Sequence, residues 1–116
     1  MGINSYTVVN LIGTATAKTY VVEGPVNLTT GTLVPLSSVS LPVTALEIYG
    51  YQSVGANTLP VANAAAAFVS MGGGPPIDQV PAGGVLSYAQ MGARFDLKDL
   101  SILGTTGDRV FLKYLT

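Results

Sequence analysis

Seven prolines and fourteen glycines divide the sequence into short runs rich in Val, Thr, Tyr and Ile. Such runs are too short for stable helices, and their residue types favour strands. The pattern therefore predicts an all-β chain in which about eight strands form, with the prolines between the strands or at their ends. The candidate strands are residues 6–12, 19–22, 31–34, 38–41, 45–51, 65–71, 85–91, 93–97, 100–103 and 109–115.

The end of the chain predicts a β-hairpin. Residues 100–103 and 109–115 are β-rich runs on either side of GTTGD (104–108), whose glycines suit a positive φ. Strand alternation gives the last run two faces. One face carries Val110, Leu112 and Tyr114, and the other carries Phe111, Lys113 and Leu115. Since both are largely apolar, this strand is either central to a sandwich or covered on one face by a neighbouring subunit.

Three segments leave alternatives open. Residues 62–68 (ANAAAAF) form either a marginal helix or, given the FVSM that follows, a strand of small residues. Residues 71–84 hold five glycines and three prolines, which is typical of a loop. Residues 1–20 form either a first strand pair or an extended arm that pairs with a neighbour. We expect one domain over residues 1–116, because this length is common for a single core.

The chain is unusually poor in charge. Charged residues make up 9% of it, against about 25% in an ordinary soluble domain. Six acidic and five basic residues nearly cancel, so we expect neither a nucleic acid nor a membrane as partner. No apolar run reaches the length of a membrane span, and the N-terminus lacks a signal-peptide pattern. The surface is either neutral and exposed to water, or covered by other subunits.

Residues that usually carry catalysis are scarce. The chain has no His and no Cys, so the usual zinc ligands, thiol nucleophiles and imidazole bases are missing. Asp96, Asp99 and Asp108 are candidates for a calcium site, although their spacing matches no known calcium loop. The better-motivated interpretation is that Asp99 and Asp108 accept backbone N–H bonds in tight turns. We expect no enzyme activity, no metal site and no cofactor.

A resemblance carried by residues 45–116 narrows the function. The segments ALEIYGYQSVGANTLPVA, VPAGGVLSY and ARFDLKDLSILGTTGDRVFLKYL are similar to the end of small β-sandwich structural proteins of tailed bacteriophages. The resemblance implies a jelly-roll-like β-sandwich in a virion, either as a capsid decoration (cement) protein or as part of a fibre or other appendage. The residues before 45 and the segment NAAAAFVSMGGGPP depart from this pattern.

These observations together predict a capsid decoration protein on the outer capsid surface. Its expected partners are the major capsid protein and further copies of itself, as a dimer or trimer. We expect residues 1–20 to dock, and two tyrosines with one face of the last strand to make subunit contacts. The candidate interface residues are Tyr6, Val8, Leu11, Tyr49, Tyr51, Phe111, Lys113 and Leu115.

An alternative function is a tail- or fibre-associated module that engages host-surface glycan. Tyr49 and Tyr51 would share one strand face, an arrangement that can stack a sugar or anchor an interface. The simpler expectation for the six tyrosines is a ring packed on the core with its hydroxyl at the rim.

Overall fold

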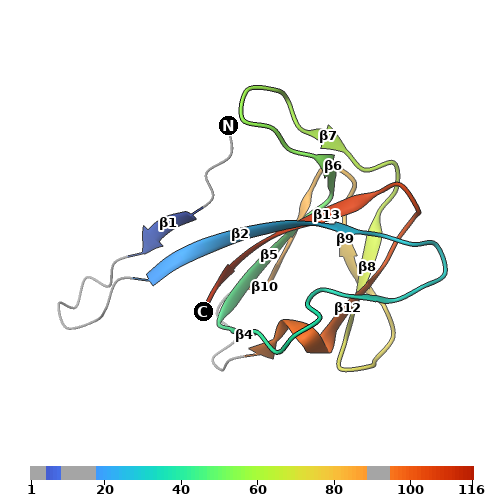
Figure 1. Ribbon diagram of the computed structural model, residues 1–116. Helices are drawn as coiled ribbons and strands as arrows, with labels where there is room; N and C mark the ends of the chain where they lie inside the picture. Colours follow the sequence, from blue (N-terminus) through green and yellow to red (C-terminus); the bar gives the residue numbers. More distant parts are fainter. Residues whose placement is uncertain (1–4, 9–17, 89–94) are drawn as a thin grey trace.

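The computed structural model describes the backbone of residues 5–8, 18–88 and 95–116, and the side chains of 19–88 and 95–116. Within these ranges the chain is almost entirely β (Figure 1). The elements are β1 (Ser5–Val8), β2 (Lys18–Asn27), β3 (Val34–Pro35), β4 (Pro42–Val43), β5 (Ala45–Tyr49), β6 (Tyr51–Ser53), β7 (Val61–Ala62), β8 (Ala67–Met71), β9 (Asp78–Val80), β10 (Val85–Tyr88), β11 (Phe95–Asp96), the 3₁₀ helix η1 (Leu97–Asp99), β12 (Leu100–Leu103) and β13 (Arg109–Leu115).

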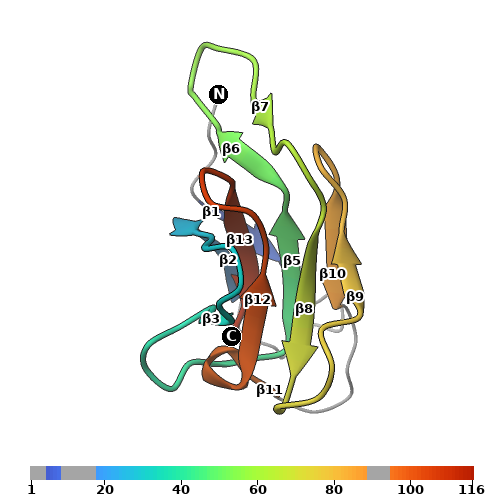
Figure 2. The ribbon, with the colours of Figure 1, turned by 90° about the vertical axis from the view of Figure 1, so that its right-hand side faces the viewer.

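Two main sheets pack face to face (Figure 2). One has the order β1-β2-β13-β5-β10 and the other β3-β12-β8-β9. Four antiparallel pairs, β2–β13, β3–β12, β5–β10 and β8–β9, nest within one another along the chain. This is the pairing of a long hairpin rolled into two sheets, which defines an eight-stranded jelly roll. The predicted all-β, jelly-roll-like sandwich is therefore confirmed, with β1 and two short pairs, β11–β4 and β6–β7, added to it.

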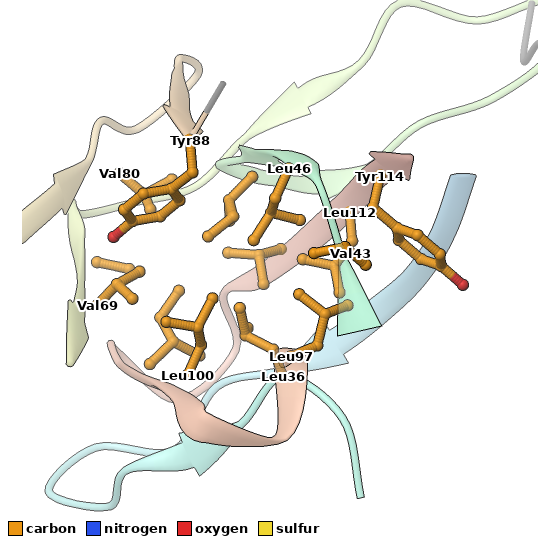
Figure 3. Close-up of a cluster of buried hydrophobic side chains, with 14 of the residues drawn as sticks. Leu36, Val43, Leu46, Val69, Val80, Tyr88, Leu97, Leu100, Leu112 and Tyr114 are labelled. Carbon is orange, nitrogen blue, oxygen red and sulfur yellow. The ribbon is translucent and has the colours of Figure 1, made fainter. Parts of the chain in front are cut away.

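The core lies between the two main sheets. Side chains from both sheets and from the connecting loops meet there (Figure 3). The alternation predicted for the last strand is confirmed, because Val110, Leu112 and Tyr114 are buried while the other three side chains are half-buried. The buried apolar residues are Leu28, Leu36, Val43, Leu46, Ile48, Ala67, Val69, Val80, Tyr88, Leu97, Leu100, Ile102, Val110, Leu112 and Tyr114.

The predicted hairpin at the end of the chain is wrong. Both strands have the predicted bounds, but β12 and β13 belong to different sheets. Residues 104–108 therefore cross from one sheet to the other. The crossing is held by Leu28, whose N–H donates to the Asp108 carbonyl at 3.1 Å. A Cβ at position 104 would overlap the Leu28 side chain, so Gly104 permits this close approach.

Among the other predictions, the strand at residues 38–41 and the loop at residues 71–84 are also wrong. Residues 38–41 are not a strand, because the Leu41 N–H donates to the Asp96 carboxylate and not to a neighbouring strand. The Ser40 hydroxyl donates to the same carboxylate. The predicted loop 71–84 contains β9, which pairs with β8. Gly and Pro on both sides hid this three-residue strand from the sequence pattern.

Strand β2 is longer than predicted and runs through Pro25. A register shift opposite residues 110–112 puts one extra residue on β2 at this point, which is a β-bulge. Among the described residues, β1 pairs with residues 18–21 and none pairs with β2 on this side at Pro25, so β2 is a sheet edge there. The missing N–H is tolerated at such an edge or bulge.

The first strand pairs within its own chain. β1 runs antiparallel to β2, with Tyr6 opposite Tyr20 and Val8 opposite Lys18. Of the two alternatives for residues 1–20, the described part thus adopts the first strand pair, at one edge of the five-stranded sheet (Figure 1). Leu11 lies outside the described residues.

Candidate interaction surface

The outward side of the five-stranded sheet is the candidate interaction surface, and we call it the outer face. Its members are set by strand register, since residues paired across strands share a side of the sheet. Lys113 pairs with Val22 and Glu47, which fixes the register of the rest. Among the residues whose side chains the structure describes, the outer face comprises Tyr20, Val22, Ala45, Glu47, Tyr49, Val85, Ser87, Phe111, Lys113 and Leu115.

The two charges among the described side chains of the outer face are paired with each other. Lys113 Nζ lies 3.5 Å from Glu47 Oε1 and 5.5 Å from the centroid of the Tyr20 ring. The Tyr49 hydroxyl donates to the same Glu47 oxygen at 2.7 Å. Because both ionised side chains are partly exposed, the pair contributes only about 0.2–1 kcal/mol to stability. Among the side chains that the structure describes, the outer face therefore carries no net charge and is mostly apolar or aromatic.

Of the predicted interface residues whose side chains the structure describes, four meet on this face, namely Tyr49, Phe111, Lys113 and Leu115. Tyr51 does not continue the strand of Tyr49, because the predicted strand 45–51 divides at Gly50 into β5 and β6. A Cβ at Gly50 would overlap the Pro81 carbonyl oxygen, so the backbone of the β9–β10 turn approaches closely there. The Tyr51 hydroxyl donates to the carbonyl of Gly83 in that turn at 2.9 Å.

Sequence reasoning missed six members of the outer face, among them Val85, Tyr20 and Val22. Val85 is 46% exposed and lies opposite Tyr49. Tyr20 and Val22 lie opposite Leu115 and Lys113. Their alternation was visible in the sequence, but assigning them to this face required the pairing of β2 with β13, which joins the two ends of the chain.

A second polar cluster holds the end of the sandwich from which β6 and β7 project (Figure 2). Asp108 is only 2% exposed, and its carboxylate accepts from the N–H groups of Ala64 at 2.9 Å and Ala65 at 3.1 Å and from Gln52 Nε2 at 2.9 Å. Burial alone would raise the pKa of Asp108. The three donors outweigh burial and hold this pKa below its usual value.

Asn63 reinforces the same end. Its side chain is buried and bonds both backbone groups of Arg109: the Arg109 N–H donates to Asn63 Oδ1 at 3.0 Å, and Asn63 Nδ2 donates to the Arg109 carbonyl at 2.7 Å. Residues 63–65 are thereby fixed to the start of β13. In the alanine-rich segment 62–68, Ala62 thus ends β7, residues 63–66 form a bend fixed to β13, and β8 begins at Ala67.

At the opposite end of the sandwich, the Asp96 side chain holds the turn together by hydrogen bonds. Its carboxylate accepts from the Ser40 hydroxyl, from the Leu41 N–H at 2.8 Å and from the Lys98 N–H at 2.9 Å, which caps η1. These bonds, the Ser40 hydroxyl first, lower the pKa of Asp96. Asp96 and Asp108 flank β12 at its two ends and do not share a site. The residues that the structure describes contain no group of three or more acidic side chains able to hold a metal ion.

The prediction that Asp99 and Asp108 accept backbone N–H bonds in tight turns is right in part. Asp108 does accept backbone N–H bonds, although from a distant loop and not from its own turn. For Asp99, the backbone carbonyl accepts from the Gly72 N–H at 3.0 Å. The acid that caps its own local turn is Asp96.

Two tyrosines match the expected rim position. The Tyr88 hydroxyl donates to Asp78 Oδ2 at 2.6 Å, and the Tyr114 hydroxyl donates to Glu23 Oε1 at 2.7 Å. Both rings belong to the core, and their hydroxyls point away from it at opposite sides (Figure 3). Burial, and then the bond to Glu23, raise the pKa of Tyr114 to about 12, and the pKa of Tyr88 is also raised.

Comparisons with protein-family models, with curated proteins and with solved structures returned no match to this chain. Among the described residues, no helix is long and apolar enough to cross a membrane. The outer face and the two ends of the sandwich are therefore the features of the molecule that bear on its function.

Proposed function

We propose that this protein is a phage capsid decoration (cement) protein that binds the outer capsid surface and stabilises the particle by contact, without catalysis. Two things support the proposal. One is the resemblance of residues 45–116 to phage virion proteins. The other, which carries the proposal, is the described part of the outer face, where aromatic and aliphatic side chains surround the Glu47–Lys113 pair.

The outer face is suited to a second copy of the same chain. A two-fold interface uses the same patch on both subunits, so the patch must be complementary to itself. Glu47 and Lys113 are neighbours of opposite sign, so a two-fold axis near them sets each charge beside its opposite on the other copy. The aromatic and aliphatic side chains around the pair supply the apolar area.

The area of this face sets the expected strength. Four strands about 4.8 Å apart and about six residues long give a flat footprint of roughly 400 Å² per copy. A standard interface buries about 800 Å² per partner, so pairing through this face alone is weak. Binding to symmetry-related sites on a shell multiplies such contacts, because a copy held nearby raises the effective concentration of the next. Many weak contacts would thus resist expansion of the shell.

Substitution of Val85 tests the subunit contact. We expect Val85→Asp to reduce self-association at least about tenfold, because the carboxylate would be desolvated without a partner in the interface. Sedimentation velocity over a concentration series measures the effect. Leu33 is a matched control, since both residues are 46% exposed and Leu33 precedes β3 in the other sheet. A wild-type protein that stays monomeric at high concentration and does not co-sediment with capsids of its phage would refute the proposal.

The alternative is a tail- or fibre-associated module that binds glycan. Tyr20 and Tyr49 on the outer face are the tyrosines placed to stack on a sugar. Binding of the isolated protein to host cells or to a glycan array, lost in Tyr49→Ala, would favour this function. Co-sedimentation with capsids and no binding to cells would favour the decoration function.

A further inference from the structure

A projecting hairpin at one end of the sandwich is a second candidate contact. We call residues 51–62, which comprise β6, its loop and β7, the apical hairpin (Figures 1 and 2). It extends beyond both sheets and carries three exposed large hydrophobic side chains. Leu59 is 89% exposed, Val61 50% and Val54 47%. Leu59 is the most exposed of the large hydrophobic residues that the structure describes.

The apical hairpin lies within a long uncharged stretch. No Asp, Glu, Lys or Arg occurs from residue 48 to residue 77. A contact made by this hairpin therefore offers no counter-charge to its partner. A charged group on the partner would be desolvated without compensation, so the chemistry favours an uncharged, apolar receiving site.

The base of the apical hairpin is held more firmly than a surface loop requires. The Gly50 carbonyl accepts from the N–H groups of Gly83 at 2.8 Å and Asn63 at 3.1 Å. Gln52, just inside the hairpin, and Ala64, just after it, both donate to Asp108. The chain has few charged residues, and it buries one of them, Asp108, to bind these donors. The carboxylate orders both legs of the hairpin before any partner binds, which lowers the entropic cost of docking.

We propose that the apical hairpin docks the protein on its shell by inserting Leu59, flanked by Val54 and Val61, into an uncharged apolar recess of the shell protein. This inference rests on the proposed decoration function and names the element that performs it. The receiving site is a recess because the hairpin projects beyond both sheets (Figure 2) and Leu59 on it is almost fully exposed. A bilayer is a poorer match, since loops that bind anionic membranes carry basic residues and residues 48–77 have none. The predicted docking segment, residues 1–20, is then not needed for attachment.

Co-sedimentation of the full-length protein with capsids assembled without it tests the proposal. We expect Leu59→Ser to weaken capsid binding at least about tenfold, since it removes an anchor from the centre of the contact. Ile77→Ser is the matched control, because Ile77 is also an exposed aliphatic residue, at 72%, in the β8–β9 loop at the other end of the sandwich. We expect the control variant to bind like the wild type. Circular dichroism melting checks that both variants are folded.

The outcomes separate the two proposals. Wild-type binding with unchanged Leu59→Ser binding overturns the docking inference and leaves the decoration function standing. No wild-type binding overturns both. Binding of the wild type to phosphatidylcholine–phosphatidylglycerol vesicles, lost in Leu59→Ser, assigns the hairpin to a bilayer and overturns the inference. So does a Leu59→Ser change in the sedimentation of the free protein, which would make the hairpin a contact between copies.

Discussion

At each end of the sandwich, one aspartate carboxylate accepts the hydrogen bonds that hold neighbouring segments together. Asp108 accepts two backbone N–H groups and one side-chain donor, and so does Asp96. The environments differ. Asp108 is almost fully buried, and its donors come from residues 52, 64 and 65. Asp96 is half-buried, and its donors come from residues 40, 41 and 98, with water within reach.

Burial decides how much each carboxylate matters. If the buried acid is removed, its donors lose their acceptor where water enters poorly, and each unsatisfied group costs about 1–3 kcal/mol. If the half-buried acid is removed, water replaces it. The Asp108 end is therefore a fixed base for the apical hairpin, while the Asp96 end is a solvated turn that connects β4, β11 and η1. The same motif thus gives rigidity at one end and only local order at the other.

The largest expected effect is that of removing the buried acid. We expect Asp108→Ala to lower the free energy of unfolding by about 3 kcal/mol, because the Ala64, Ala65 and Gln52 donors all lose their acceptor. Urea denaturation measures the loss. Asp108→Asn is the control, since it keeps one acceptor oxygen and similar volume, and we expect it to lose less. If the Asp108→Ala protein is as stable as the wild type, the buried carboxylate contributes no more to stability than the solvated one.

Acid should weaken both ends. Each of these carboxylates has a pKa below its unfolded-state value of 3.8, so the folded state binds fewer protons than the unfolded state. Their contribution to stability is present above 3.8 and is lost as the pH falls through the lower folded-state pKa. We expect the urea midpoint to be flat above about pH 5 and to decline below about pH 4.

The Asp108→Asn variant tests how much of the loss of stability in acid is due to Asp108. Because the amide does not titrate in this range, we expect the variant to lose part of the decline between pH 5 and pH 2, measured in the same urea series. An equally steep decline in the variant would assign the acid sensitivity to other carboxylates, such as Asp96.

The sequence predicted the elements better than their partners. Strands β12 and β13 have the predicted bounds, because alternation and turn residues are local properties of the chain. Their hairpin was wrong because Leu28, some eighty residues away, holds residues 104–108 across the gap between the sheets. No local pattern reports such a contact. Strand β9 was missed for the converse reason, since it is strand only through its pairing with β8.

In the candidate sites, too, the sequence predicted local properties and missed the contacts between distant parts of the chain. The outward side of β13 was predicted from alternation alone, and Tyr49 joins it through direct pairing. The tendency of Asp108 to accept backbone N–H bonds is a property of its residue type, but its donors at 64 and 65 follow from the crossing of the chain between sheets. The apical hairpin was not singled out because its exposure depends on where the sandwich ends. Its uncharged sequence was the one signal available.

The smallest expected effect is that of removing the solvated acid. We expect Asp96→Ala to lower the melting temperature less than Asp108→Ala does, because water can hydrate the Leu41 and Lys98 N–H groups that the carboxylate leaves. Its effect should be local. Hydrogen exchange should speed up at the amides of Leu41 and Lys98 and stay unchanged at Ala64 and Ala65, whose acceptor is at the other end. Ser40→Ala, which removes one donor and keeps the carboxylate, should leave both backbone amides protected. If Asp96→Ala instead deprotects Ala64 and Ala65 as well, the two ends are coupled through β12, and the rigidity of the apical hairpin is a property of the whole sandwich.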